Sequence, residues 1–261
     1  MTEAAPAKGS GGAGRETRRK AAQEGESLDA AVRREGEEEA PPPLGLKEIQ
    51  DHPVLSAYIA QADRQMDGMG FTEHGFRHAK LTGAIANNVL DRLGHEERAV
   101  TLGAIAGYLH DIGNCVSRSD HGQTGAVLVH QVLQGRMEPA DLAVLMGAIG
   151  NHEEEYGHAV GPVAAAVILA DKSDVHRSRV RKADTVEFDI HDRVNYAVEE
   201  SFLRVDSEAR TITLELTIDT SISHVGEYFE IFLDRMKMCR LAAEELECGF
   251  RVLINETEVL K

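Results

Sequence analysis

The sequence predicts a mainly α-helical protein with a small α+β region near its C-terminal end. Of its 261 residues, 42% are hydrophobic, but only 5% are aromatic and none is tryptophan, a composition that favours helices with small apolar side chains. Apolar residues recur at helical spacing from Leu44 to Asp171 and alternate as in strands after residue 200. The chain is long enough to bury one substantial core.

Residues 1–43 differ in composition from the rest of the chain. A glycine-rich stretch at 9–14 and a basic stretch at 15–20 precede a segment of mixed charge, and three prolines follow at 41–43. Few large apolar side chains are available there to offset the entropy lost on folding. We therefore predict a disordered tail that ends in a stiff linker.

Glycine, proline and capping residues divide the central region into about six predicted helices. Their short polar connections favour an all-α bundle, which we assign to residues 44–200 as one domain. The expected helices cover residues 44–66, 72–94, 96–110, 119–133, 139–149 and 162–171.

The last part of the chain, residues 201–261, combines strand-like alternation with one long helix. We interpret it as a small α+β subdomain that either makes a homodimer contact or closes over a site in the bundle. The expected elements are strands at 201–205 and 211–218, a helix at 223–246 and a hairpin formed by 250–254 and 259–260.

Composition also limits the partners and the compartment of the protein. No apolar run approaches the roughly 18 residues that a membrane span needs, and the N-terminus lacks the apolar stretch of a signal peptide. The three cysteines, Cys115, Cys239 and Cys248, cannot all pair and show no CxxC spacing, which indicates a reduced, cytoplasmic protein. A formal net charge of −16 disfavours nucleic acid and anionic membranes as partners. A small anionic substrate would need local basic residues or metal ions.

Histidines and aspartates of the central region form an ordered set of candidate metal ligands. A buried helix ends at His110-Asp111, where two polar side chains are costly to place without a compensating partner. Each candidate alone has an ordinary explanation, such as a helix cap or a solvated side chain. Together, four imidazoles and two carboxylates suit two closely spaced divalent transition-metal ions, with manganese or iron favoured and cobalt, nickel or zinc as alternatives. The candidates are His78, His110, Asp111, His121, His152 and Asp171.

The order of these residues resembles the pattern of the HD superfamily of metal-dependent phosphohydrolases. The resemblance covers about residues 70–182, and Leu109-His110-Asp111-Ile112-Gly113 is similar to the signature itself. The segment 74–78 is similar to an opening H-x-x-x-H helix whose second histidine is a ligand. Residues 151–154 and 162–171 resemble the later histidine segment and the closing helix of HD-GYP proteins. The same six ligands also resemble those of HD-type diadenosine tetraphosphate hydrolases.

Two features depart from the family pattern. Asn114 stands where a lysine that contacts phosphate is often found, and Gly157-His158-Ala159 replaces the Gly-Tyr-Pro motif, so a cyclic-di-GMP role has little support.

A basic cluster follows Asp171, and arginine forks suit phosphate oxygens, although a solvated helix end would also carry such charges. From it we select Lys172, Arg177 and Arg181 as candidate substrate contacts, and the neighbouring Asp174 and His176 as partners or proton carriers.

The leading functional hypothesis is hydrolysis of a phosphoester or phosphoanhydride in a small, nucleotide-like substrate. Asp111 and His110 are the expected catalytic pair. Two ions bridged by Asp111 would lower the pKa of a bridging water towards about 7. Two alternatives stay open, an HD-type mixed-valent di-iron oxygenase with the same ligands and a nucleotide-binding module without turnover. In the hypothesis His78, His110 and Asp171 hold one ion together with Asp111, and His121 and His152 hold the other.

Overall fold

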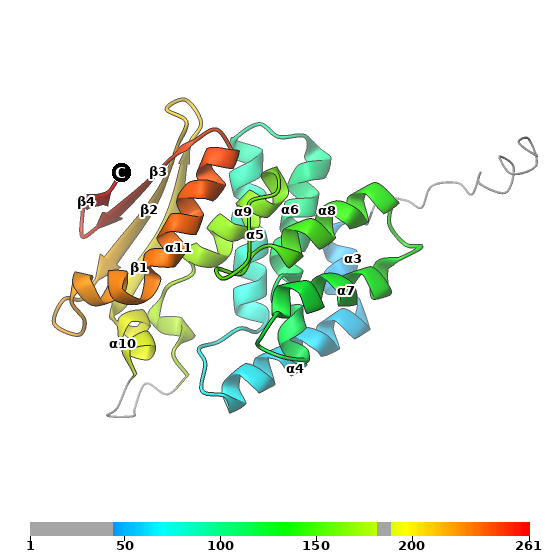
Figure 1. The fold of residues 1–261 in the computed structure, drawn as a ribbon, viewed down its shortest axis with the longest axis horizontal. Coiled ribbons are helices and arrows are strands. Elements are labelled where there is room, and N and C mark those ends of the chain that lie inside the picture. Colours follow the sequence, from blue (N-terminus) through cyan, green and yellow to red (C-terminus); the bar gives the residue numbers. More distant parts are fainter. Residues whose placement is uncertain (1–43, 182–188) are drawn as a thin grey trace, which may run out of the picture. The chain divides into compact units, whose positions relative to one another are not determined.

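Helices form the core of the chain, and a four-stranded sheet follows them near the C-terminal end (Figure 1). The computed structural model describes residues 44–181 and 189–261, so the tail predicted for residues 1–43 lies outside the described part. The predicted fold class, mainly α with a small α+β region, is confirmed. None of the described helices is both long enough and apolar enough to cross a membrane.

Helix α9 (Pro162–Ser173) lies at the centre of the helical core. It contacts α5, α6, α8 and the later helix α11, and every residue from Val163 to Ala170 is buried. This position places Asp171, near the end of α9, inside the protein. The other core elements are α3 (Leu46–Gln50), α4 (Pro53–Gly68), α5 (Phe76–Arg92), α6 (Glu97–Leu109), the 3-10 turn η1 (Ile112–Cys115), α7 (His121–Leu133) and α8 (Pro139–Gly150).

Two helix boundaries differ from the prediction. The helix expected over residues 44–66 is divided into α3 and α4, because Pro53 begins the second helix and cannot continue the first. Helix α5 begins at Phe76 instead of residue 72. The preceding segment is held outside the helix, since the Glu73 amide donates to the Arg179 carbonyl at 2.8 Å and the Arg179 guanidinium donates back to the Glu73 carbonyl.

Helices α5 and α6 approach each other closely at two glycines. A Cβ atom at Gly107 would lie 2.8 Å from the carbonyl oxygen of Thr82, and a Cβ at Gly83 would lie 2.8 Å from a carbonyl oxygen of α6. Larger residues at these positions would push the helices apart. The close packing brings His78 at the start of α5 next to His110 at the end of α6.

The C-terminal region is a sheet with strand order β1-β2-β3-β4 and one long helix, α11 (Val225–Glu245). Strands β2 and β3 are parallel and α11 connects them, while the β1/β2 and β3/β4 pairs are antiparallel. Helix α11 contacts both the sheet and α9, so it lies between the sheet and the helical core (Figure 1). The strands are β1 (Val198–Asp206), β2 (Thr211–Ile218), β3 (Gly249–Ile254) and β4 (Thr257–Leu260).

Two short elements between the core and the sheet were not predicted. The 3-10 turn η2 (Arg177–Arg179) and helix α10 (Ile190–Ala197) precede β1. Helix α10 is only eight residues long and its N-cap, Asp189, accepts a hydrogen bond from the Asp192 amide. The domain boundary at residues 200–201 stays a prediction, and the described residues belong to one compact unit.

Candidate metal centre

The six predicted metal ligands lie together where several helix ends meet. Their ligand atoms form three overlapping groups, and within each group all atoms lie within 4.8 Å of one another. The four imidazoles are buried, which is costly for polar groups that lack a charged or hydrogen-bonding partner. His78 comes from the first turn of α5, His110 and Asp111 from between α6 and η1, His121 from the start of α7, His152 from the residues after α8, and Asp171 from the last turn of α9.

The Asp111 carboxylate is shared between two pairs of histidines. Its Oδ2 atom lies 3.5 Å from Nε2 of His78 and 3.4 Å from Nε2 of His110. Its Oδ1 atom lies 3.2 Å from Nε2 of His121 and 3.8 Å from Nε2 of His152. The two oxygens of one side chain therefore face two separate imidazole pairs, as a bridging carboxylate requires.

Distances within each half of the cluster suit a shared cation. The Nε2 atoms of His78 and His110 are 3.1 Å apart, and those of His121 and His152 are 3.0 Å apart. Two nitrogens that bind the same ion, each at about 2.1 Å, are about 3.0 Å apart when the N–ion–N angle is about 90°. Asp171 belongs to the first half, since its Oδ1 atom lies 3.3 Å from His78 and 3.5 Å from His110.

Each imidazole is oriented by a hydrogen bond from its other ring nitrogen. A nitrogen that faces a carbonyl or carboxylate oxygen must carry the proton, so Nδ1 donates and Nε2 is left to present a lone pair to the cluster. Lone pairs that face each other at about 3 Å need a proton or a cation between them. The acceptors are the Asp174 carboxylate for His78 (2.7 Å), the Gly107 carbonyl for His110 (2.8 Å), the Arg118 carbonyl for His121 (2.9 Å) and the Ile149 carbonyl for His152 (2.7 Å).

One further observation shows that the residues fit a metal. Oδ2 of Asp111 is buried and has no hydrogen-bond partner among the residues that the structure describes, although such an atom normally costs free energy unless it is paired. A cation between Asp111, His78 and His110 would satisfy it. Neutral imidazoles with carboxylates are also the donor set that divalent first-row metals accept.

Charges in the cluster keep both carboxylates ionised at neutral pH and place a competing proton on His110. Burial would raise the pKa of Asp111, but the neighbouring His110 holds it well below its usual range. Lys172 acts in the same way on the pKa of Asp171. Burial alone would lower the pKa of His110, but the two carboxylates raise it to about 10, whereas burial lowers the pKa of His152 to about 4. An ion that binds Nε2 of His110 must therefore displace a proton.

Asp174 fixes the orientation of His78 and is itself enclosed by cations. Beside its contact with His78, it pairs with Arg77 at 2.8 Å and with Arg179 at 3.6 Å. Burial would raise the pKa of this carboxyl, but Arg179 and His78 keep it well below its ordinary value. The predicted role of Asp174 as a partner of the ligands is visible in this contact.

Two other side chains hold ligands in place. Asn114, which departs from the family pattern, donates from Nδ2 to Oδ1 of Asp111 at 2.9 Å. Glu153 lies with Oε2 at 3.0 Å from Nδ1 of His121, and its Oε1 accepts the Gly122 amide at 2.5 Å. Asn114 thus orients the shared carboxylate, and Glu153 anchors the start of α7.

Gly113 permits the close approach of α7 to the end of α6. A Cβ atom at this position would lie 1.9 Å from the carbonyl oxygen of His121. No side chain fits there without moving α7, so the glycine after the His-Asp pair sets the distance between the two halves of the cluster.

Lys172 is buried beside the cluster and is fully paired. Its ammonium lies 2.5 Å from Oδ2 of Asp171 and 3.1 Å from Oε1 of Glu154, and the same Glu154 oxygen lies 2.8 Å from Nε of Arg235 on α11. A continuous row of alternating charges therefore connects the ligand Asp171 to the C-terminal region. The structure assigns Lys172 an ion-pairing role, and its contact with substrate stays a prediction.

The other two predicted substrate contacts have partners outside the cluster. Arg177 pairs with Glu199 at 2.9 Å, and Arg181 pairs with Asp63 on α4. His176 donates from Nε2 to the carbonyl of Glu199 at 2.8 Å. A substrate that bound Arg177 or Arg181 would have to replace these partners.

A cavity of about 450 Å³ adjoins the cluster and is bordered by residues 69–74, α10 and α11. Arg118 and His74 line it, and both contact metal-ligand candidates. Nη1 of Arg118 lies 3.3 Å from Nε2 of His121, and the ring of His74 lies 5.6 Å from that of His78. The sequence analysis did not select Arg118, although its place three residues before His121 was a usable signal.

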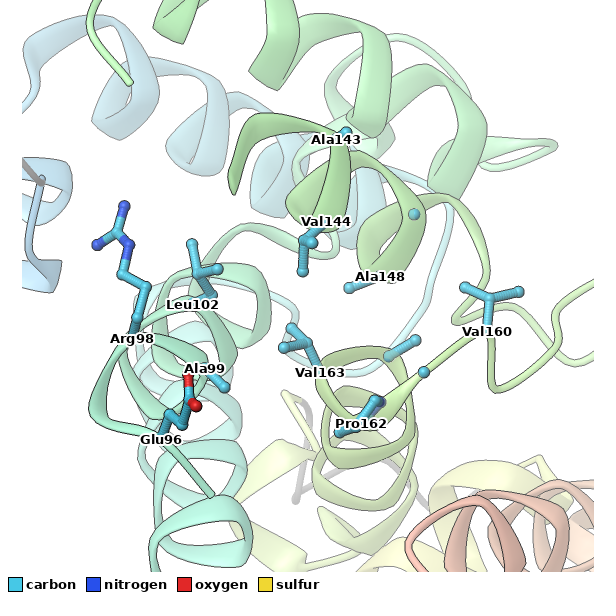
Figure 2. A pocket seen from close by; sticks show the side chains of 13 residues that line it. Glu96, Arg98, Ala99, Leu102, Ala143, Val144, Ala148, Val160, Pro162 and Val163 are labelled. Atoms are coloured by element: carbon cyan, nitrogen blue, oxygen red, sulfur yellow. The ribbon is translucent and has the colours of Figure 1, made fainter. Parts of the chain in front are cut away.

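A second cavity, of about 560 Å³, lies between α6, α8 and α9 (Figure 2). Its lining is mostly apolar and includes Val144, Val160 and Val163, with Glu96 and Arg98 on one side (Figure 2). None of the six clustered side chains lines either cavity. The first cavity is linked to the candidate metal centre through Arg118 and His74.

Comparison with known proteins adds one family match. Residues 73–187 match the family model described as the HD domain. No curated protein matches the chain. All six clustered side chains fall inside the matched range. Residues 73–187 are thus similar to the HD domain, whose family is made up typically of metal-dependent phosphohydrolases.

Proposed function

We propose that this protein is a metal-dependent phosphohydrolase that cleaves a phosphoester or phosphoanhydride bond in a small, nucleotide-like substrate. The observation that carries the proposal is the Asp111 carboxylate, whose two oxygens face separate pairs of imidazole Nε2 atoms. Manganese or iron is the expected metal, and two ions per chain are expected. Asp111 would be shared, with His78, His110 and Asp171 holding one ion and His121 and His152 holding the other.

The residues of the chain support hydrolysis by water over attack by a protein nucleophile. Bound divalent ions supply Lewis acidity to phosphoryl oxygens and acidify a coordinated water. Burial raises the pKa of Cys115, the cysteine nearest the cluster in sequence, so its thiol is a poor nucleophile at neutral pH. Asn114 and Asp174 keep Asp111 and His78 oriented, which a metal-assisted reaction needs.

A panel of substrates tests the proposal. The protein, loaded anaerobically with Mn²⁺ or Fe²⁺, would be incubated with p-nitrophenyl phosphate, bis(p-nitrophenyl) phosphate, nucleotides and dinucleotides. Phosphate or nitrophenol should be released, and Asp111→Asn should reduce release to background. Asp91→Asn, an exposed change on α5, is the matched control and should keep full activity.

Other outcomes identify the alternatives. Substrate-dependent oxygen uptake with a mixed-valent iron signal, and no release of phosphate, would indicate the di-iron oxygenase. Tight nucleotide binding without turnover under Mn²⁺, Fe²⁺, Co²⁺, Ni²⁺ and Zn²⁺ would indicate a binding module. Either result would contradict the proposed hydrolase.

A further inference from the structure

The cavity beside the cluster is built by two parts of the chain. Residues 69–72, His74 and Arg118 belong to the helical core, α11 belongs to the C-terminal region, and α10 lies between the two in the chain. Its volume of about 450 Å³ lies within the roughly 300–1,000 Å³ of small-molecule sites. Three arginines line it, Arg118, Arg179 and Arg235, and their partners differ.

Arg179 has a structural role, because its guanidinium donates to the backbone carbonyls of Glu73 and Asp174. Arg118 is different. Its nearest polar contacts are His121 at 3.3 Å and Asn114 Oδ1 at 3.4 Å, and its guanidinium lies 5.5 Å from the centre of the Phe71 ring. Among the described residues it has no carboxylate within ion-pair distance.

A half-buried guanidinium without a carboxylate is unexpected in this chain, which has 44 acidic and 28 basic residues. Desolvating a cation costs free energy that an anion normally offsets. A contact with the imidazole of His121 is a weak replacement for a carboxylate. When His121 binds a metal, its Nε2 lone pair is no longer available to Arg118, and the guanidinium is left to bind an anion at the same place.

Arg235 reaches the cavity from α11. Its Nε atom pairs with Glu154 at 2.8 Å and its guanidinium lies 4.6 Å from the centre of the Phe232 ring. Glu154 also pairs with Lys172, which pairs with Asp171. Arg235 therefore lies near the Asp171 half of the cluster, and Arg118 lies near the His121 half.

We propose, on the basis of the proposed function, that Arg118 and Arg235 bind the phosphate oxygens of the substrate from opposite halves of the cluster. The remainder of the substrate lies along α10, where the carboxylates of Asp189 and Asp192 line the cavity. Carboxylates accept hydrogen bonds from hydroxyl and amino groups. The favoured substrate is thus a phosphorylated molecule with such donors, of which a nucleoside monophosphate is one. The C-terminal region completes the substrate site.

His74 supports the assignment of one part of the cavity to phosphate and another part to hydroxyl or amino groups. Its Nδ1 atom donates to the Thr72 carbonyl at 2.6 Å, so its Nε2 atom is an acceptor. An acceptor nitrogen suits a hydroxyl or amino group and does not suit a phosphate oxygen.

Binding without turnover tests the assignment. Titration calorimetry on the full-length, Mn²⁺-loaded protein would compare inorganic phosphate and a non-hydrolysable phosphonate analogue of AMP as probes, with manganese content measured on each variant. Arg118→Gln and Arg235→Gln should each weaken phosphate binding by about tenfold or more, because a hydrogen bond to a charged group is lost. Arg92→Gln, on the exposed side of α5, is the matched control and should not change it.

A second comparison distinguishes binding of phosphate by the arginines from binding of the rest of the substrate along α10. Asp192→Asn should weaken binding of the AMP analogue without changing phosphate binding. Phosphate affinity equal to wild type in both arginine variants would overturn the proposal, and so would loss of manganese from Arg118→Gln, since Arg118 would then support the ligands instead. If the arginine variants lose affinity for phosphate and no substrate is hydrolysed, the anion site is supported and the proposed hydrolase activity is contradicted. If the protein hydrolyses a substrate and the arginine variants bind phosphate as the wild type does, only the assignment of the arginines is contradicted.

Discussion

His78 and Asp174 are joined by a buried hydrogen bond of 2.7 Å between the imidazole Nδ1 and the carboxylate. The contact links the first turn of α5 to the end of α9, which are 96 residues apart in the chain. It fixes the ring so that Nε2 points at Asp111 and Asp171. One carboxylate that is not in the ligand set therefore determines the orientation of a ligand.

Replacement of this carboxylate tests its role. Asp174→Asn removes the charge that pairs with Arg77 and Arg179 and weakens the acceptor for His78. We expect the affinity for Mn²⁺ to fall by about 10- to 100-fold and the free energy of unfolding of the metal-free protein to fall by about 3 kcal/mol. Calorimetric Mn²⁺ titration and denaturant unfolding measure both. Asp67→Asn is the exposed control, and equal values in the two variants would contradict the role given to Asp174.

Metal affinity should increase with pH. In the metal-free protein the pKa of His110 is raised from 6.5 to about 10, so its proton stabilises the folded state fully below about pH 6.5, and that contribution is lost as pH rises through about 10. A metal ion competes with this proton. Apparent Mn²⁺ affinity should therefore rise by up to about tenfold per pH unit between pH 7 and 9. Calorimetry in buffers of different ionisation enthalpy would detect proton release, and its absence would show that His110 is already neutral.

The glycine after the His-Asp pair should tolerate no side chain. Gly113→Ala places a Cβ against the His121 carbonyl, so α7 must move or the helix end must distort. We expect a loss of about 1–3 kcal/mol in the free energy of unfolding, measured by urea denaturation, and a weakened second metal. Gly226→Ala on α11 is a suitable comparison, because no atom lies within 4 Å of its added Cβ. Equal stability of both variants would show that the end of α6 is more adaptable than its contacts suggest.

Mutations in the buried row of charges around Lys172 should have coupled effects on the free energy of unfolding. Lys172→Met leaves Asp171 and Glu154 without their shared cation, and we expect it to destabilise the protein by about 3–5 kcal/mol. Adding Glu154→Gln removes one of the two carboxylates and should restore part of this loss. A double-mutant cycle from thermal or urea unfolding measures the coupling. Strictly additive effects of the two changes would mean that the Lys172–Glu154 contact contributes nothing.

The fold class and the positions of most helices could be predicted because local patterns determine them. Pro139 and Pro162 each begin a helix where predicted, and Asp120 precedes α7 as a cap position. The start of α5 could not be predicted, because the bonds between Glu73 and Arg179 join residues 106 positions apart. Tertiary contacts of this kind leave no local pattern.

The candidate site, like the fold, could be predicted where local sequence patterns determine it and not where tertiary contacts do. The six ligands follow one another in a recognisable order, and the structure brings all of them together. The substrate contacts were chosen from basic residues next to Asp171 in the sequence. Acidic partners on other elements, Glu199 for Arg177 and Asp63 for Arg181, were not visible from that position. Arg235 reaches the cavity from α11, far along the chain from the ligands, and no local motif marks it.

Metal content is the most direct test of the shared carboxylate at Asp111. Protein purified without oxygen, or reconstituted with Mn²⁺ or Fe²⁺, would be analysed by inductively coupled plasma mass spectrometry beside Asp111→Asn and the control Asp91→Asn. We predict about two ions per chain in the wild type and the control, and loss of both ions from Asp111→Asn, because each half of the cluster depends on one oxygen of this side chain. One ion or none in the wild type, or two ions retained in Asp111→Asn, would contradict a centre bridged by Asp111.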